Sequence, residues 1–175
     1  GVQTCALPIL ASVGVDTWGV DFSFLGADGA LLANPVCYRD ARTRGMLAAA
    51  ERTVSRADMF EATGLQFMEI NSLFQLLALE RDKATVLGAA ERMLLIPDIF
   101  HWLLSGVASN ERTNASTTQC YDPRRGDWAH GMLERFSLPR RIFGPLVDPG
   151  TDLGPLRPEV AAETGLVGTR VVVPG

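Results

Sequence analysis

The sequence of 175 residues is 47% hydrophobic and 21% charged, as is typical of a globular domain with a core. Its net charge of -4 and the lack of a basic stripe argue against nucleic-acid binding. No apolar run has the length of a membrane span, and three cysteines without metal-like spacing favour a reduced, cytoplasmic chain without a metal site.

The first nine residues, GVQTCALPI, show no clear period and join the following segment without a turn or linker. We expect them to be foreign to the domain, which then comprises residues 10–175. Residues 12–38 predict antiparallel strands, because residues 20–24 alternate between apolar and polar side chains. Asp28-Gly29 predicts a hairpin turn, and Pro35–Tyr38 predict a further strand.

Helical signals follow from Arg42 onwards. Five helices are expected. Four run between the residues that start and end them, Ser55 to Gly64, Pro97 to Gly106, Asp127 to Phe136, and Pro158 to Gly165. The other begins with Ser72 and Gln75 as a capping pair ahead of an apolar run. Residues 169–173 return to strand character. The pattern therefore predicts an α/β fold with antiparallel strands at the start, followed by helices.

The segment DTWGVD, residues 16–21, is unusually polar for a core strand. Asp16 and Asp21 would face opposite sides of a regular strand, so we expect hydrogen-bonding anchors rather than a catalytic acid and base. Gly19 indicates either a bulge or a place where a ligand approaches the backbone. Trp18 is either a core residue or a flat wall for a polyol.

The segment YRDARTR, residues 38–44, is the densest polar cluster. It is either a solvated turn, with Asp40 or Thr43 capping the next helix, or a clamp for sugar hydroxyls in which Arg42 donates and Asp40 accepts. The two histidines, His101 and His130, have no partner at metal-like spacing, and structural roles are favoured for both.

Taken together, these segments resemble the rhamnulokinase branch of the FGGY carbohydrate kinase family. The resemblance is carried by DTWGVDF and YRDART, and it continues through FEATGLQFMEINSLFQLLAL, LLIPDIFHWLLSG and ERTNASTTQCYD to VDPGTDLG and VVVPG. It covers Ser12 to Gly175.

The resemblance implies an incomplete ribonuclease-H-like domain of the actin and hexokinase type, the sugar-binding half of a two-domain kinase. The implied reaction transfers the γ-phosphoryl group of ATP, with Mg²⁺, to the 1-hydroxyl of L-rhamnulose, with an aspartate as general base. Gly19 matches a glycine that contacts substrate, with Trp18 beside it. Asp40 and Arg42 match a pattern near the pocket, whereas helix capping is the preferred role for Asn71 and Gln75.

Two family elements have no counterpart in the sequence. They are a phosphate-binding loop like Asp-Leu-Gly-Ala-Ser-Ser and the catalytic aspartate, which is expected directly after Gly175. We therefore expect an inactive fragment of an active enzyme, without catalytic residues and largely without elements that bind ATP or Mg²⁺. The alternatives are a kinase for another ketose, such as L-fuculose or xylulose, a non-catalytic sugar-binding protein, and a stand-alone structural domain.

Overall fold

The computed structural model describes residues 10–175. The prediction that residues 1–9 are foreign concerns a segment outside the described residues. The helices are α1 (Met46–Glu51), α2 (Arg56–Thr63), α3 (Ser72–Arg81), α4 (Thr85–Ala89), α5 (Ile96–Ser105), α6 (Arg112–Ala115), α7 (His130–Arg135) and α8 (Pro158–Thr164), with 3-10 turns η1 (Ala41–Thr43), η2 (Ser116–Thr118) and η3 (Arg140–Ile142). The strands are β1 (Ser12–Val13), β2 (Phe22–Leu25), β3 (Arg92–Leu95), β4 (Asn110–Glu111), β5 (Tyr121–Asp122), β6 (Asp127–Trp128), β7 (Leu146–Val147), β8 (Asp152–Pro155) and β9 (Arg170–Val172).

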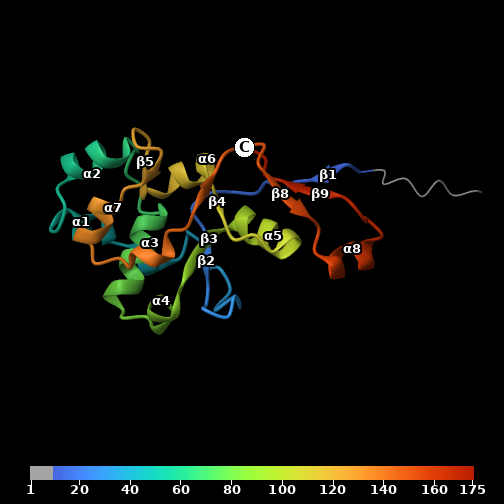
Figure 1. Cartoon of the computed structure of the whole chain (residues 1–175). Helices are drawn as coiled ribbons and strands as arrows, with labels where there is room; N and C mark the ends of the chain where they lie inside the picture. Colours follow the sequence, from blue (N-terminus) through green and yellow to red (C-terminus); the bar gives the residue numbers. More distant parts are fainter. Residues whose placement is uncertain (1–9) are drawn as a thin grey trace, which may run out of the picture.

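The strands form small mixed sheets. One sheet has the order β1-β9-β8, in which β1 runs parallel to β9 and β8 runs antiparallel to it. A second sheet pairs β2 with β3 in antiparallel register, with Phe22 opposite Leu95. Figure 1 shows helices α1, α2, α3, α4 and α7 on one side of the molecule, and β1, β8, β9 and α8 on the other. The expected mixture of helices and strands is therefore present.

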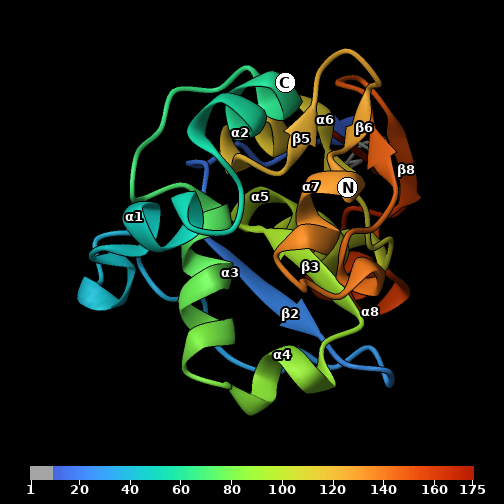
Figure 2. The same cartoon turned by 90° about the vertical axis from the view of Figure 1, so that its left-hand side faces the viewer.

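The β2-β3 pair lies inside the molecule because both of its faces are apolar. On one face, Phe22, Phe24 and Met93 belong to a core shared with Leu73 and Phe74 of α3. On the other face, residues of both strands pack against the start of α5, in a second cluster formed by Leu25, Leu94, Ile96 and Ile99. Figure 1 shows the pair between α3 and α5, and Figure 2 shows β2 running beside α3. The segment that leads into β2 is thus anchored to a buried scaffold.

Several helix ends lie where the sequence predicted them. The Ser55 hydroxyl accepts a hydrogen bond from the Asp58 amide at the start of α2, and Gly64 ends this helix with a positive φ. Helix α5 has Pro97 in its first turn and ends at Gly106, whereas α8 begins at Pro158 and ends at Gly165. The predicted strand near the end of the sequence is confirmed as β9.

Three local predictions are wrong. Pro35–Tyr38 form no strand, because the chain turns there and the Asp40 amide donates to the Cys37 carbonyl. The helix expected over 128–136 begins only at His130, since Trp128 pairs with Tyr121 in β6. Ser72 and Gln75 form no capping pair, because both side chains bond instead to a distant carbonyl, described below.

Candidate functional site

Residues 15–19 form an irregular loop between β1 and β2 instead of continuing a strand. The loop ends in a three-residue turn, in which the Asp21 amide donates to the Gly19 carbonyl at 2.9 Å. Val20, in the middle of this turn, has a φ of 67°. A γ-turn with positive φ is rare and strained, and a β-branched residue there is exceptional.

The turn is held by side chains that lie far away in the sequence. The Val20 carbonyl accepts hydrogen bonds from the Ser72 hydroxyl at 2.7 Å and from the Gln75 amide at 3.0 Å, both at the start of α3. Asp21 is buried, and its carboxylate accepts a hydrogen bond from the Trp18 indole at 2.9 Å. Such external bonds are what allow a strained backbone to persist. Asp21 is therefore a hydrogen-bonding anchor, as the sequence predicted.

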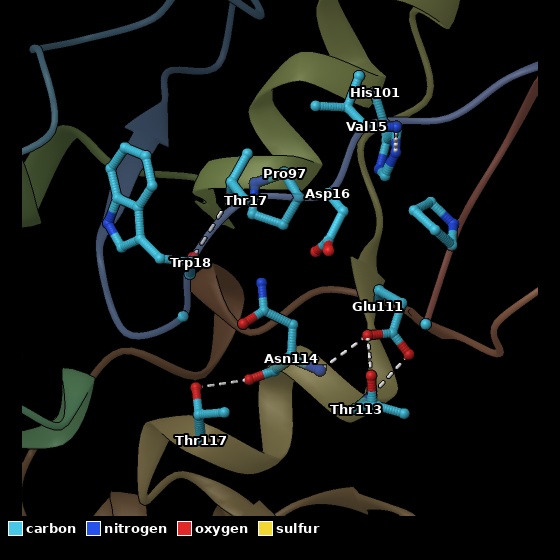
Figure 3. Close-up of a pocket in the computed structure, with 13 residues that line it drawn as sticks. Val15, Asp16, Thr17, Trp18, Pro97, His101, Glu111, Thr113, Asn114 and Thr117 are labelled. Carbon is cyan, nitrogen blue, oxygen red and sulfur yellow. Dashed lines mark hydrogen bonds between the residues drawn. The ribbon is translucent and has the colours of Figure 1, made fainter.

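A cavity of about 190 Å³, with several polar side chains in its lining, lies beside this loop. Figure 3 shows side chains of the loop on one side and of the segment 111–117 on the other. The lining residues are Val15, Asp16, Thr17, Trp18, Gly19, Pro97, His101, Glu111, Thr113, Asn114, Thr117, Pro174 and Gly175. The cavity thus lies between the loop that follows β1, helix α5, the β4-α6-η2 segment and the residues after β9.

Gly19 permits the loop to approach η2 closely. A Cβ atom at this position would lie 2.8 Å from the Thr117 Oγ1 and 3.1 Å from the Asn114 Oδ1. The first distance is shorter than real Cβ contacts allow. Packing within the protein is therefore enough to require a glycine at position 19, whether or not a ligand also lies close to it.

The cavity has a rigid polar support on the side of α5 and β4. The buried His101 imidazole accepts a hydrogen bond from the Val15 amide through Nε2 at 3.2 Å, and burial lowers its pKa. Glu111 caps α6, because its carboxylate accepts from the Thr113 amide, the Thr113 hydroxyl and the Asn114 amide. The neighbouring Asp98 carboxyl accepts hydrogen bonds from Asn110, Glu111 and Leu95, which lower its pKa in part, but burial raises this pKa to about 7.

Of the residues predicted to bind substrate, the structure places Gly19 and Trp18 on the cavity and places Asp40 and Arg42 outside it. The exposed Asp40 accepts a hydrogen bond from the Arg42 amide and so caps η1. The Arg42 guanidinium donates to the Gln75 Oε1 at 2.8 Å. Its pKa is lowered by burial, whereas the charges of Asp40 and Asp21 raise it. Arg42 is thus tied through Gln75 to the strained turn.

Asn71 corrects the capping prediction in a second way. It lies at the N-cap position of α3, yet its side chain makes no capping bond to that helix. Its Oδ1 accepts from the Met68 amide, and its Nδ2 donates to the Thr117 carbonyl at 2.8 Å. Asn71 therefore connects α3 to η2, the element that Gly19 contacts.

The sequence did not single out the far wall of the cavity, formed by Glu111, Thr113, Asn114 and Thr117. These residues lie about a hundred positions from the loop, so no local spacing joins the two walls. The available signal was the segment ERTNASTTQCYD, which carries several short polar side chains with a carboxylate.

The cavity has few side chains that would bind a metal ion or ATP. Within residues 10–175, no group of three or more His, Cys, Asp or Glu side chains could hold a metal ion. The lining residues include Asp16 and Glu111 but neither lysine nor arginine. This set suits neutral hydroxyl groups and does not suit the triphosphate of ATP, which needs cations. In the same described range, no helix has the length and apolar character needed to cross a membrane.

Comparisons with known proteins agree on one family. The N-terminal domain of the FGGY family of carbohydrate kinases matches residues 7–175. Rhamnulokinases from Yersinia pestis (strain Pestoides F) and Bacteroides thetaiotaomicron are 40% and 41% identical to this chain, over 83% and 90% of it. The chain spans only 30% and 32% of their lengths.

A solved structure shows the same fold. The gluconate kinase from Lactobacillus acidophilus superposes with a TM-score of 0.86 at 18% sequence identity, over 94% of this chain and 34% of that protein. The predicted actin- and hexokinase-type fold is thereby confirmed.

Proposed function

The chain belongs to the FGGY family of carbohydrate kinases, and on this premise we propose that it is the sugar-binding part of a rhamnulokinase. The observation that carries the proposal is the sequence identity to rhamnulokinases over most of the chain. In the proposed reaction, the whole enzyme transfers the γ-phosphoryl group of ATP to the 1-hydroxyl of L-rhamnulose in the cytoplasm. ATP would supply the phosphoryl group, and Mg²⁺ would neutralise the negative charge on it.

The proposed sugar contacts are Gly19 and Trp18, because both line the cavity. Figure 3 shows the Trp18 indole directed away from the cavity, and its Nε1 donates to Asp21, so the contact proposed for Trp18 is through its backbone. Asp40 and Arg42 are proposed to act at the margin of the site, where Arg42 reaches the Val20 turn through Gln75.

We propose that residues 1–175 alone do not phosphorylate a sugar. The Glu111 carboxylate is occupied by three hydrogen bonds, which makes it a poor general base. Because Gly175 lines the cavity, an aspartate directly after it in the whole enzyme would lie near the sugar. That aspartate is the proposed general base.

Titration calorimetry of this chain with millimolar L-rhamnulose, L-fuculose, xylulose and gluconate tests the proposal. We expect heat of binding with L-rhamnulose and weaker or no heat with the other sugars. Preference for another ketose would reassign the substrate, and no binding of any sugar would favour a structural domain. A parallel assay of ADP release should show no sugar-dependent ATP consumption, and measurable turnover would contradict the proposed inactivity of the fragment.

A further inference from the structure

We propose that Asp16 and Asn114 form a hydroxyl-binding pair that makes this cavity select neutral sugars over sugar acids. This inference rests on the proposed function, because it takes the cavity to be the sugar site. It assigns the choice of substrate class to two residues on opposite walls of the cavity.

The first observation is that both side chains have free hydrogen-bonding capacity. The Asn114 Nδ2 is buried and has no hydrogen-bond partner within the described part of the chain. The Asp16 carboxylate forms no hydrogen bond to the other residues drawn in Figure 3, where it points into the cavity from the loop. The Asn114 amide points into the same space from α6. A buried donor without a partner is costly, so a ligand that accepts a hydrogen bond there would bind favourably.

The second observation is that most of the neighbouring polar groups are already used. Both oxygens of Glu111 accept bonds from Thr113 or Asn114, as described above. The Thr117 hydroxyl donates to the Asn114 carbonyl at 2.8 Å, and the His101 Nε2 accepts from the Val15 amide. These bonds fix the walls of the cavity. Within the described residues, the Asp16 carboxylate, the Asn114 Nδ2 and the His101 Nδ1 are left without a partner, and Asp16 and Asn114 are the two that face each other across the cavity.

The two free groups are complementary to hydroxyls. An ionised carboxylate only accepts hydrogen bonds, whereas an amide nitrogen only donates them. A hydroxyl does both, so adjacent hydroxyls of a sugar can donate to Asp16 and accept from Asn114. A carboxylate ligand could accept from Asn114 but has nothing to donate to Asp16.

Charge strengthens this selection. Asp16 and Glu111 are both acidic, and no lysine or arginine is among the described residues that line the cavity. Asp16 is exposed, and a sugar acid would bring a third negative charge beside Asp16 and Glu111 without a cation to balance it. Asp16 therefore favours a neutral sugar in two ways, by accepting its hydroxyl protons and by repelling an acid.

Calorimetry of this chain with L-rhamnulose and with L-rhamnonate, the aldonic acid of the isomeric aldose, tests the inference. We expect the parent sequence to bind the ketose and not detectably the acid. Asn114→Ala should weaken ketose binding about 3- to 10-fold, the loss expected for one hydrogen bond. Asn114→Asp keeps the shape but replaces the donor with a charge, so it should weaken binding further. Asp16→Asn should weaken ketose binding about tenfold and allow measurable binding of the acid.

The controls are Asn34→Ala and Glu163→Gln, at exposed positions outside the cavity. They remove an amide and a negative charge, and both should bind L-rhamnulose like the parent sequence. If the parent binds the ketose while Asn114→Ala and Asp16→Asn bind it equally well, the inference is wrong and the proposed function stands. Equal binding of the acid by the parent refutes the selectivity. Absence of ketose binding by the parent refutes the inference together with the proposed function.

Discussion

Replacing Gly19 by alanine should destabilise the protein by about 1–3 kcal/mol, the usual cost of forcing an extra methyl group into a packed site. The new Cβ would lie 2.8 Å from the Thr117 Oγ1. Backbone strain does not enter, because the φ of Gly19 lies outside the left-handed region. The cost therefore comes from contact with the Thr117 side chain.

Thr117 cannot move away without loss. Its hydroxyl donates to the Asn114 carbonyl at 2.8 Å, and breaking that bond costs about 1 kcal/mol. This sets the lower end of the expected range for Gly19→Ala. Thr117→Ala also loses this bond and should cost about 1 kcal/mol by itself. Because Thr117→Ala removes the Oγ1 atom that the new Cβ would contact, the double variant should be about 1 kcal/mol more stable than the sum of the two single effects predicts.

Urea denaturation followed by circular dichroism gives the free energy of unfolding of the four proteins in this cycle. Gly131→Ala is the matched control, because a Cβ at this position in α7 meets no atom within 4 Å. It should be neutral or slightly stabilising. If Gly19→Ala is as stable as the parent, or if the two substitutions are simply additive, the close approach of the loop to η2 does not limit this position.

Two further predictions concern the same loop. At Val20, where φ is 67°, Val20→Gly should be about 1 kcal/mol more stable than Val20→Ala, which is the reverse of the usual order. Urea denaturation of the two variants measures this difference. A higher free energy of unfolding for Val20→Ala would disprove the strained turn. Burial lowers the pKa of His101, so between this pKa and about 6.5 the unfolded chain binds more protons than the folded protein. His101 should therefore make the free energy of unfolding fall as the pH drops below 6.5, whereas Asp98, whose pKa burial raises to about 7, should make it rise over the same range. Urea titrations of the parent and of His101→Gln from pH 5 to 8 isolate the contribution of His101. The parent should lose free energy of unfolding relative to the variant as the pH drops, and a constant difference between the two would contradict the assignment.

The fold could be predicted where short segments decide their own structure. The ends of α2, α5 and α8 are set by capping residues, prolines and glycines that lie within a few positions of each other. The errors lie where distant partners decide. Residues 20–24 alternate like a strand, yet Ser72 and Gln75 bind the Val20 carbonyl and the chain turns at its start. The helix predicted from Trp128 likewise starts later, because Trp128 pairs with Tyr121 across a hairpin.

Only one of the two walls of the candidate site could be predicted from the sequence. The polar residues of the DTWGVD segment drew attention because they are costly in a core, and Gly19 and Trp18 do line the cavity. The opposite wall was missed, because Glu111 and Asn114 become neighbours of the loop only through folding. The resemblance to a kinase family named the segment that contains them without indicating any role for its side chains.

The parallel pairing of β1 with β9 has a consequence for how the protein forms. The Thr169 hydroxyl bonds to the Leu10 carbonyl across 159 positions of sequence, and Ser12 pairs with Arg170 beside it. Contacts of such long range are slow to form, because the entropy of closing the intervening loop is lost before they are made. During synthesis on the ribosome, β1 must therefore wait for almost the whole domain to emerge before its partner is available. Until then β1 lacks the strand that it pairs with in the folded protein.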